Sequence, residues 1–300
     1  MSKKTNSDLI KNYINKQDKI SEQTKKTYMQ TAKTLPFNIT TTQPTIIKKL
    51  NELYDNPNTK SLYLNMIIIV RRDNDLETDK LIKLRNELRT EIIKLRKDNL
   101  SDTKNDLPTY KNIIEKLNEL NGIRYILNYL LITYGLRNKD LNLLYVNKLP
   151  ENQKDENYLL HNSKSIKLII NDYKTDKSFG SKTIEIKDKK FKEELNKMNI
   201  KDNTYILAKK NGDKLKLNSF NDKIISLTID GLGETKIFKI LVKHLLDTKN
   251  FTKLEELVNS RGTSLSTIMK SYNVYNNNNT KSDAKKNDEI NEEIKNNIKD

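Results

Sequence analysis

The sequence of 300 residues contains no cysteine and only two histidines. The absence of cysteine excludes disulfides, thiolate metal sites and cysteine catalysis. His161 and His244 are too few and too far apart along the chain for a histidine-based metal site. Long apolar runs are also missing, since the longest, 66–70 and 126–136, fall far short of the roughly 20 residues that a membrane span needs. No signal peptide is recognisable, so we expect an intracellular protein that is not secreted.

Acidic residues are in deficit relative to basic ones. Lys plus Arg number 56 and Asp plus Glu number 40, which leaves a formal net charge of +16. An excess of that size favours a polyanionic partner, nucleic acid before membrane, because many phosphate contacts release counterions together. The alternative is an AT-rich genome that raises lysine and asparagine everywhere, a composition compatible with a virus or mobile element. The low hydrophobic share of 35% and the charged share of 32% predict helices with long polar faces.

Residues 1–100 are predicted to form a small helical DNA-binding bundle. Apolar residues recur at helical spacing in a short piece at 8–13 and in four helices that follow it. Lysine and arginine occupy the outer faces, so the bundle suits contacts to a DNA backbone. The candidate phosphate-binding residues are Arg71, Arg72, Arg85, Arg89 and Arg96. The alternative for each of them is a solvated surface charge.

A polar, proline-terminated segment separates this bundle from the rest of the chain. We place a linker at 101–108, a catalytic-like domain at 109–275 and a low-complexity tail at 276–300. In the second domain a nearly all-apolar helix at 123–133 belongs in a core. Arg137 lies at the turn after that helix, on rigid structure, which is the placement that two-pronged phosphate recognition requires.

The convincing β region of the sequence is one hairpin. Strands are predicted at 165–172 and 182–187, joined by a turn at 173–181. Lys174 and Lys177 lie in this turn, where a lysine can contact a DNA phosphate or donate a proton to a leaving oxygen. Because helices precede and follow the hairpin, the predicted fold class is mainly α with a small β sheet (α+β).

The stretch from Arg261 to Tyr272 closes one helix at Gly262 and begins a short second helix with a Thr-Ser start signal. Tyr272 lies near the end of that second helix. Its phenol can attack a phosphodiester and hold the broken strand as a phosphotyrosine. The alternative is that Tyr272 only caps a hydrophobic face. Tyr275, three residues further on, is the rival nucleophile.

These motifs, in this order, resemble the tyrosine recombinase (phage-type integrase) family, whose near relatives are the type IB topoisomerases. The likeness spans roughly residues 5–275. It includes Ser-Glu-Gln-Thr-Lys-Lys-Thr-Tyr in the bundle, Thr-Tyr-Gly-Leu-Arg137-Asn-Lys-Asp after the apolar helix and Tyr-Lys174-Thr in the hairpin turn. Tyr272 follows Thr263 at the spacing that the family keeps between its Gly-His motif and its nucleophile.

The resemblance implies a core-binding bundle followed by a recombinase-like catalytic domain. The implied activity is DNA strand breaking and rejoining, in site-specific recombination or integration, through a 3′-phosphotyrosyl intermediate. Tyr272 would be the nucleophile, Arg137 the phosphate clamp and Lys174 the general acid, with Lys177 competing for that role. The implied partners are double-stranded DNA and further copies of the chain on DNA, with no metal or other cofactor. The protein would reside with its target DNA, in host cytoplasm, nucleus or virus factory.

The sequence departs from the family at its His-x-x-Arg box, which should lie near 235–242. Neither histidine nor arginine occurs there, and depending on register Lys239 or Phe238 replaces the second arginine. Lys236 or Lys239 would be a makeshift second cation, and Thr263, in place of the Gly-His histidine, a hydrogen-bonding stand-in. Losing one fixed donor from such a site typically slows the reaction about 10²–10³-fold. The alternative function is therefore a catalytically impaired DNA-binding protein that keeps the fold.

Overall fold

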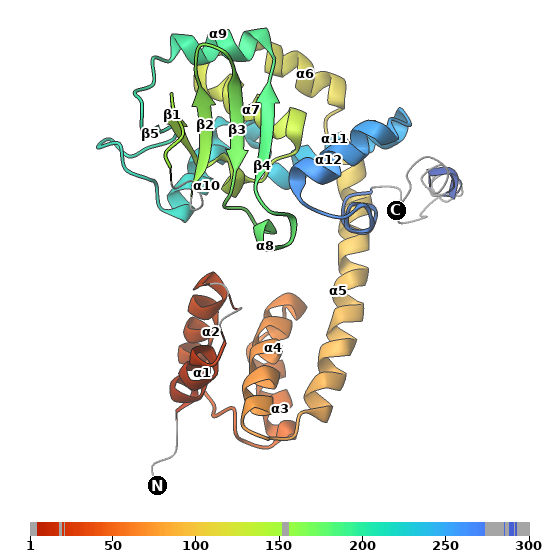
Figure 1. The fold of residues 1–300 in the computed structure, drawn as a ribbon. Coiled ribbons are helices and arrows are strands. Elements are labelled where there is room, and N and C mark those ends of the chain that lie inside the picture. The colour runs from red at the N-terminus through yellow and green to blue at the C-terminus, as the bar shows by residue number, and fades with distance from the viewer. Residues whose placement is uncertain are drawn as a thin grey trace. The chain divides into compact units, whose positions relative to one another are not determined.

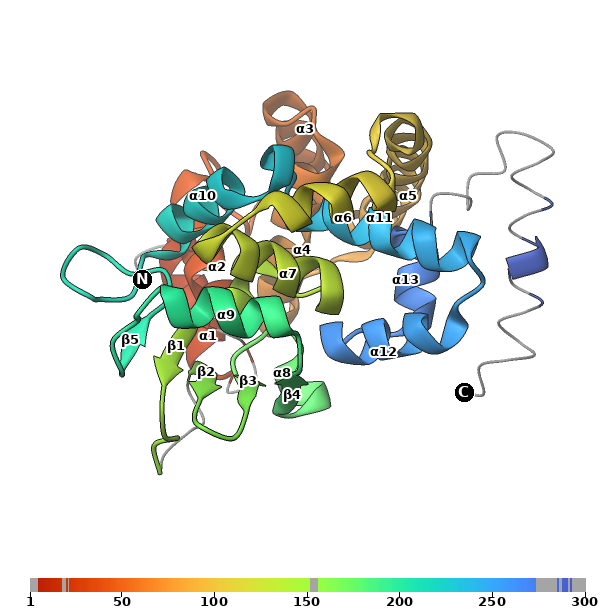
Figure 2. The same ribbon diagram turned by 90° about the horizontal axis from the view of Figure 1, so that it is seen from above.

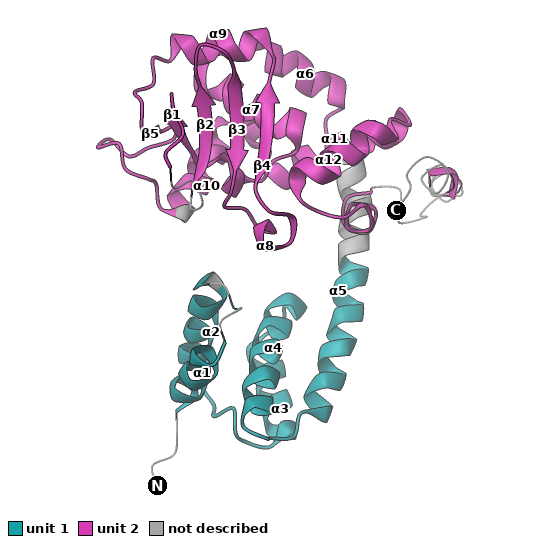
Figure 3. Ribbon diagram, in the orientation of Figure 1, with its two compact units in different colours: residues 1–98 teal, residues 99–300 magenta. Residues whose placement is uncertain are grey.

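The structure is a computed structural model, drawn as a ribbon in Figure 1. It describes residues 5–17, 20, 22–151 and 156–273, and in the C-terminal tail residues 285, 288–290 and 292. The chain divides into two compact units, Met1–Asp98 and Asn99–Asp300 (Figure 3). Helices dominate both units and a small five-stranded sheet lies in the second. The predicted fold class, mainly α with a small β sheet, is confirmed.

The first unit is built from amphipathic helices around one core. Its helices are α1 Asn6–Asn15, α2 Glu22–Thr34, α3 Gln43–Leu53, α4 Pro57–Asp73 and α5 Asp79–Asp106. Thr5 and Asp8 form a capping box that starts α1, so the short piece predicted at 8–13 is a full helix. Its Ile10 is fully buried with Ile46 of α3 and Leu64 of α4, which shows how the helical spacing builds this core.

Helix α5 is longer than the sequence predicted. It continues to Asp106, through most of the segment predicted as a linker at 101–108. The first proline of this region is Pro108, beyond the helix end, so no residue between Asp79 and Asp106 removes a backbone donor. The boundary between the two units, at Asp98 and Asn99, therefore falls within a helix.

The second unit combines the sheet with helices, and the buried helix residues share one core with Leu143, Leu159 and Leu168 of the sheet. The strands are β1 Leu143–Val146, β2 Asn157–His161, β3 Ile166–Ile170, β4 Lys182–Ile186 and β5 Thr204–Tyr205. The longer helices are α6 Tyr110–Glu119, α7 Gly122–Tyr134, α9 Lys189–Lys197, α10 Leu217–Leu227, α11 Glu234–Asp247 and α12 Phe251–Arg261. Short helices complete the unit: η1 Asn138–Leu141, α8 Asp176–Phe179, η2 Ile229–Gly231 and α13 Leu265–Ser271.

The strand order of the sheet is β4-β3-β2-β1-β5. β1 and β2 are parallel, and all other neighbours are antiparallel. The predicted hairpin is β3–β4, with α8 in its turn. β1 and β2 were missed because they are short and buried on both faces, so their sequences lack the alternation that marks a half-buried strand.

Helix α7 lies in the middle of the second unit. Figure 2 shows α6, α9, α10, α11 and α12 around it. Seven of its residues are buried, among them the polar Asn128. Asn128 donates to the Arg124 and Leu227 carbonyls and accepts from the Ile229 N–H, so its amide is satisfied. The prediction that the apolar helix at 123–133 belongs in a core is confirmed, and the turn that follows it is firmly held.

The tail predicted at 276–300 lies mostly outside the described residues. Among those of its residues that the structure does describe, Ile290 is 3% exposed and belongs to the core of the second unit.

Candidate functional site

The turn after α7 begins with a glycine that the packing requires. Gly135 has a left-handed φ of 60°, and a Cβ there would lie 2.6 Å from Leu257 Cδ1 and 2.8 Å from Phe238 Cε2. A larger residue would push α11 and α12 away from the end of α7. The next turn is fixed by Asp140, whose buried carboxylate accepts from the Arg137 N–H at 2.9 Å. Arg137 therefore projects from a rigid corner.

The Arg137 guanidinium is directed at the C-terminal end of α12. Its Nη1 donates to the Arg261 carbonyl at 2.5 Å. Burial, and then the charge of Arg261, lower the pKa of Arg137, against smaller opposing effects of Asp140, Glu234 and Tyr272. Because Tyr272 acts on this pKa, the predicted clamp and the predicted nucleophile lie within electrostatic reach of each other.

Arg261 stands between these two residues, and in the sequence it was recognisable only as a basic residue at a helix end. Its side chain is buried, at 2% exposure, and Nη1 donates to the Gly135 carbonyl at 2.5 Å. Nη2 forms an ion pair with Glu234 at 3.3 Å. The guanidinium lies 3.9 Å over the Phe238 ring and 5.6 Å from the centre of the Tyr272 ring. Arg261 thus joins the α7 turn, α11 and α13.

Helix α11 presents Glu234 and Phe238, one turn apart, to this cluster. Glu234 also accepts a short hydrogen bond from the Asn138 N–H, and the Phe238 ring meets the Tyr272 ring edge-to-face at 4.7 Å. The α11 residue whose ring contacts both Arg261 and Tyr272 is therefore Phe238. Lys239 follows about 100° further round the helix.

The remaining lysine candidates of α11 occupy other surroundings. Lys236 is exposed and Lys239 is half-buried. Burial, and then the charge of Lys236, lower the pKa of Lys239. Lys236 and Lys239 as a second cation of the site remain predictions.

Four consecutive carbonyls at the end of α12, 259–262, accept side-chain donors from distant parts of the sequence. Lys182 Nζ lies 2.6 Å from the first and 3.4 Å from the second. Arg137 binds the third, and Thr175 Oγ1 donates to the fourth at 2.5 Å. A helix C-terminus carries partial negative charge, which favours this gathering of cations. The end of α12 therefore draws the α7 turn and the β3–β4 turn to one place.

Lys182, the first residue of β4, is the lysine that the structure brings to Arg137. Its ammonium lies 4.5 Å from the centre of the Tyr173 ring. Burial lowers its pKa to about 8, with Asp140 opposing the shift and Arg137 adding to it. Lys174 and Lys177, the lysines predicted for this role, are exposed in the turn before it. The sequence offered no signal for Lys182, because the residues that surround it in space come from distant parts of the chain and meet only when the chain has folded.

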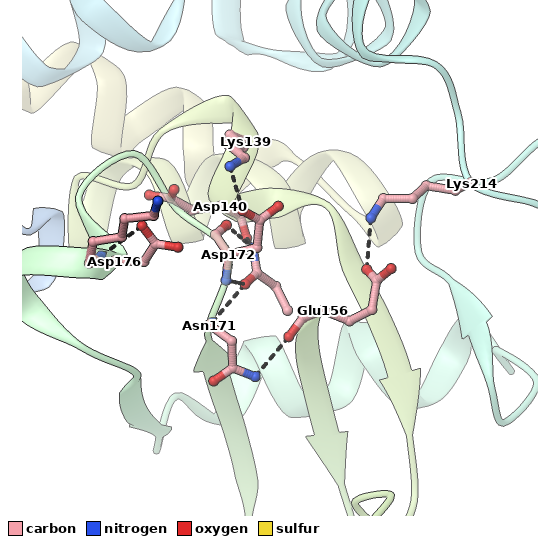
Figure 4. Close-up of polar contacts among 9 residues, drawn as sticks. Lys139, Asp140, Glu156, Asn171, Asp172, Asp176 and Lys214 are labelled. Carbon is pink, nitrogen blue, oxygen red and sulfur yellow. Dashed lines mark hydrogen bonds and ion pairs between the residues drawn. The ribbon is translucent and has the colours of Figure 1, made fainter. Parts of the chain in front are cut away.

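Polar contacts brace the strand ends that carry this turn (Figure 4). Lys139 of η1 pairs with Asp172 at 2.5 Å, and Asn171 donates to the Glu156 carbonyl at 2.8 Å. The Glu156 carboxylate pairs in turn with Lys214 at 2.8 Å. These contacts tie the end of β3 to η1 and to the segment before α10, so the residues at 173–175 start from a fixed anchor.

Tyr272 ends α13, a short helix that Ser264 caps by accepting from the Thr267 N–H at 3.2 Å. The phenol is half-buried, and its ring packs against the core of the second unit. Thr263 is half-buried beside the capping residue, and its N–H donates to the Val258 carbonyl. Tyr275, the rival nucleophile, lies outside the described residues. Both predicted roles of Tyr272, nucleophile and cap of a hydrophobic face, are compatible with this packing.

In the first unit, Arg71 is not available to a phosphate, and its prediction as a DNA contact needs correction. It is 4% exposed, and it donates to the Glu77, Ile39 and Thr41 carbonyls. These carbonyls belong to the loop after α2 and to the α4–α5 turn. The Arg71 guanidinium is buried here because its several N–H groups satisfy all three of them. Helical periodicity placed it on the outer face because the loop that covers it is distant in sequence.

Three of the other predicted arginines form a group on α4 and α5. Burial lowers the pKa of Arg85, and the charges of Arg89 and Arg72 lower it further. Arg72 and Arg89 are exposed. Arginines this close to one another favour an anionic partner. The side chain of Arg96 lies outside the described residues.

The two arginines at the end of α4 allow a direct test. Replacing Arg71 with Met is expected to lower the free energy of unfolding of the first unit by about 1–3 kcal/mol, because buried carbonyls lose their donor. Replacing Arg72 with Met is expected to change the free energy of unfolding by less than about 0.5 kcal/mol. It should also reduce, by about one, the slope of the logarithm of the duplex binding constant against the logarithm of the salt concentration, as expected for the loss of one phosphate contact. Urea unfolding and binding titrations at several salt concentrations measure both. An unchanged midpoint in the Arg71 variant would contradict the structural role.

Both histidines contact tyrosine side chains. His161 accepts or donates a hydrogen bond with Tyr145 Oη at 3.0 Å, and His244 stacks on Tyr110 at 4.0 Å. Among the described residues, no group of three His, Asp or Glu could hold a metal ion. Within the same part of the chain, no helix has the length and apolar character to cross a membrane.

Comparisons with known proteins add little to this geometry. No family model matches the sequence, and no curated protein matches it either. Among solved structures, a crystal structure of XerA recombinase is similar over 98% of this chain and 98% of its own, with a TM-score of 0.37 and 13% sequence identity. Similarity at that level does not establish a shared family.

Asp140 gives the site a pH-dependent stability. Burial raises its pKa from 3.8 to about 6. The folded state therefore binds more protons than the unfolded state between these values, and stability falls as the pH rises from about 4 through 6. The difference amounts to roughly 3 kcal/mol for this one group. In Asp140→Asn, which keeps an oxygen for the Arg137 N–H, we expect this part of the dependence to vanish when urea unfolding is measured from pH 4.5 to 7.5. A parallel pH profile in both proteins would contradict it.

Proposed function

We propose that the protein binds duplex DNA and breaks and rejoins its strands through a covalent bond between Tyr272 and a DNA phosphate. The observation that carries the proposal is the meeting of a phenol and two cations at one turn: Tyr272, Arg137 and Lys182 gather around the end of α12. A net charge of +16 and the arginine group on α4 and α5 supply further attraction for a polyanion.

The chemistry needs no metal or nucleotide, because the phosphotyrosine conserves the energy of the broken bond for rejoining. Arg137 would bind the non-bridging oxygens of the attacked phosphate with its planar fork. Tyr272 would attack the phosphorus, leaving a 3′-phosphotyrosine and a free 5′-hydroxyl. Integration, excision and resolution all use this step, so the site itself favours none of them.

A second function is favoured by a separate observation. Depending on register, the resemblance would place a second arginine at Phe238 or Lys239, and the Arg261 guanidinium, which lies over the Phe238 ring, is already held by Gly135 and Glu234. A site in which Arg137 alone of these two arginines is partly exposed has less capacity to stabilise the transition-state charge. On this alternative the protein binds DNA but is catalytically impaired.

A suicide duplex distinguishes the two functions. The duplex carries a nick close to the cleavage point, so that a short 5′-hydroxyl fragment dissociates and the protein stays bound to the 3′ end. Because the target sequence has to be found first, a library of duplexes with random central sequence is used and adducts are recovered from denaturing gels. Strand transfer predicts a covalent band, and tandem mass spectrometry of the tryptic peptide after Lys270 locates the DNA on Tyr272 or Tyr275.

The outcomes separate cleanly. Duplex binding that weakens with salt, without any covalent band, supports the DNA-binding alternative. Absence of duplex binding at low salt removes both functions.

A further inference from the structure

We propose that a cavity between α6, α7, α11 and α12 binds a small, flat and uncharged aromatic molecule that carries an N–H or O–H donor. Helices α6, α11 and α12 each pack against α7 in the second unit (Figure 2). No step of the proposed strand cleavage uses the cavity, so the inference stands apart from that function.

The size and the lining of the cavity suit a small ligand. Its volume is about 360 Å³. Ile132 of α7, Leu241 of α11 and Leu257 of α12, which are all buried, supply apolar walls. Sites for small molecules have volumes of roughly 300–1,000 Å³ and are lined mainly by apolar and aromatic side chains with a few polar groups. This cavity meets both conditions.

Four aromatic side chains determine the shape of ligand that fits. The rings of Tyr110 and His244 are stacked, with their centres 4.0 Å apart and their planes 10° apart. Tyr129 and Tyr134 of α7 meet edge-to-face, with ring centres 6.1 Å apart. All four residues line the cavity. Aromatic rings bind other flat rings by offset stacking or by edge-to-face contact, so these walls favour a planar ligand.

The ionisation of the lining favours an uncharged ligand. Burial raises the pKa of Tyr110 and of Tyr129, so both phenols stay neutral, and burial lowers the pKa of His244, so its imidazole is neutral at pH 7. The charged residues of the lining are Lys253 and Glu256, which are exposed and of opposite sign. An ionic ligand would lose hydration without gaining a buried counter-ion among the lining residues that the structure describes.

Ser260 adds the requirement for a donor on the ligand. It lines the cavity, and its Oγ donates to the Tyr134 carbonyl at 2.7 Å, with the Leu257 carbonyl also within reach at 3.0 Å. A hydroxyl has one proton to donate and two lone pairs that accept. With its proton engaged, Ser260 can only accept a hydrogen bond from a ligand, so the ligand has to supply an N–H or O–H.

A cavity beside His161 has a different lining. It is bordered by the exposed residues Asn147, Ser163, Lys192 and Asn196. Water solvates such polar groups well, so an aromatic molecule gains little by binding there. The sequence contains two histidines, and each borders a different cavity. His161 therefore provides an internal reference for a binding experiment that observes His244.

The test uses indole as the probe, because indole is flat, uncharged and carries one N–H. It is titrated into the full chain while the ring-proton resonances of both histidines are followed by NMR, and His161→Gln assigns them. The ligand control is 1-methylindole, which lacks the N–H. Thr133→Trp fills the cavity from an exposed lining position, and its matched control is Thr252→Trp, at an exposed α12 residue outside the lining. Ser260→Ala removes the acceptor.

We expect indole to shift the His244 resonances to saturation with a Kd of about 1 mM or tighter, and to leave those of His161 unchanged. Binding of 1-methylindole should be about 3–10-fold weaker, because one hydrogen bond is lost, and Ser260→Ala should bind both ligands equally. Thr133→Trp should weaken indole binding by about tenfold or more, whereas Thr252→Trp should change it by less than about twofold.

Absence of a saturable shift at His244, an equal response of His161, or full indole binding by Thr133→Trp overturns the site. Equal binding of indole and 1-methylindole by the unaltered protein overturns the role of Ser260. Circular dichroism shows whether each variant is folded. If Thr133→Trp does not fold, the comparison of two ligands and two histidines in the unaltered protein decides the question.

Discussion

Replacing Tyr272 with Phe is expected to reduce the covalent adduct with a suicide duplex to background. The substitution removes only the phenolic oxygen that would attack the phosphate, so no rate remains to be measured for this nucleophile. The ring would keep its edge-to-face contact with Phe238 and its place over Arg261, and we expect stability to change by less than about 0.5 kcal/mol. Denaturing gels report the adduct, and binding titrations on an intact duplex report the affinity, which should be unchanged.

Tyr275→Phe is the matched control, because it removes the same atom three residues further along the chain. Loss of the adduct in Tyr275→Phe with retention in Tyr272→Phe would transfer the nucleophile to Tyr275. Retention in both single variants and loss only in the double variant would mean that either phenol can reach the phosphate. Loss of duplex binding in Tyr272→Phe would show instead that the phenol matters for DNA affinity, which the proposed chemistry does not require.

The parts of the fold that could be predicted are those where the pattern of apolar residues in the sequence matches the burial of those residues in the structure. The helix at 123–133 is apolar on nearly every face, and α7 is buried on nearly every face. Arg261 and Gly262 predicted a helix end, and Gly262 closes α12 in the left-handed conformation. For the segment at 101–108 composition alone was used, and it did not reveal that a helix continues to Asp106, since polar residues continue a helix as readily as they form a loop.

The candidate site was less accessible to sequence reasoning, for a physical reason. Arg137 could be identified because its position depends on a local feature, the turn after a buried helix. Lys182 and Arg261 acquire their roles from partners about 80 and 126 positions away in the chain, at Asn259 and Gly135. No periodicity or motif encodes such pairings. Arg71 illustrates the converse, since an arginine that looked exposed by helical spacing is covered by a loop more than thirty residues away.

The buried arginine of the site connects its stability to its chemistry. The Arg261 guanidinium donates to the Gly135 carbonyl, pairs with Glu234 and lies over the Phe238 ring. The Arg261 carbonyl accepts a hydrogen bond from Arg137. A buried ion pair contributes little net stability when both partners are present, but removing one partner leaves an uncompensated charge. Arg261 is therefore better understood as a positioning residue for Arg137 and Tyr272 than as a phosphate ligand.

Replacing Arg261 with Met is expected to lower the free energy of unfolding of the second unit by about 3–5 kcal/mol, the largest stability effect that we predict. The Glu234 carboxylate would lose its partner and the Gly135 carbonyl its donor. Urea unfolding should show a lower midpoint at an unchanged slope. Arg89→Met, at an exposed arginine of α5, is the control and should change stability by less than about 0.5 kcal/mol.

Adding Glu234→Gln to Arg261→Met tests the cause of that loss. If the stranded carboxylate is responsible, the double variant should recover stability relative to Arg261→Met, giving a coupling energy of about 0.5–3 kcal/mol in the double-mutant cycle. Strict additivity of the two substitutions would mean that Glu234 and Arg261 do not act as a pair. Because Glu234 also accepts from the Asn138 N–H next to Arg137, Glu234→Gln alone should perturb adduct formation far less than Arg261→Met, since an amide oxygen still accepts that bond.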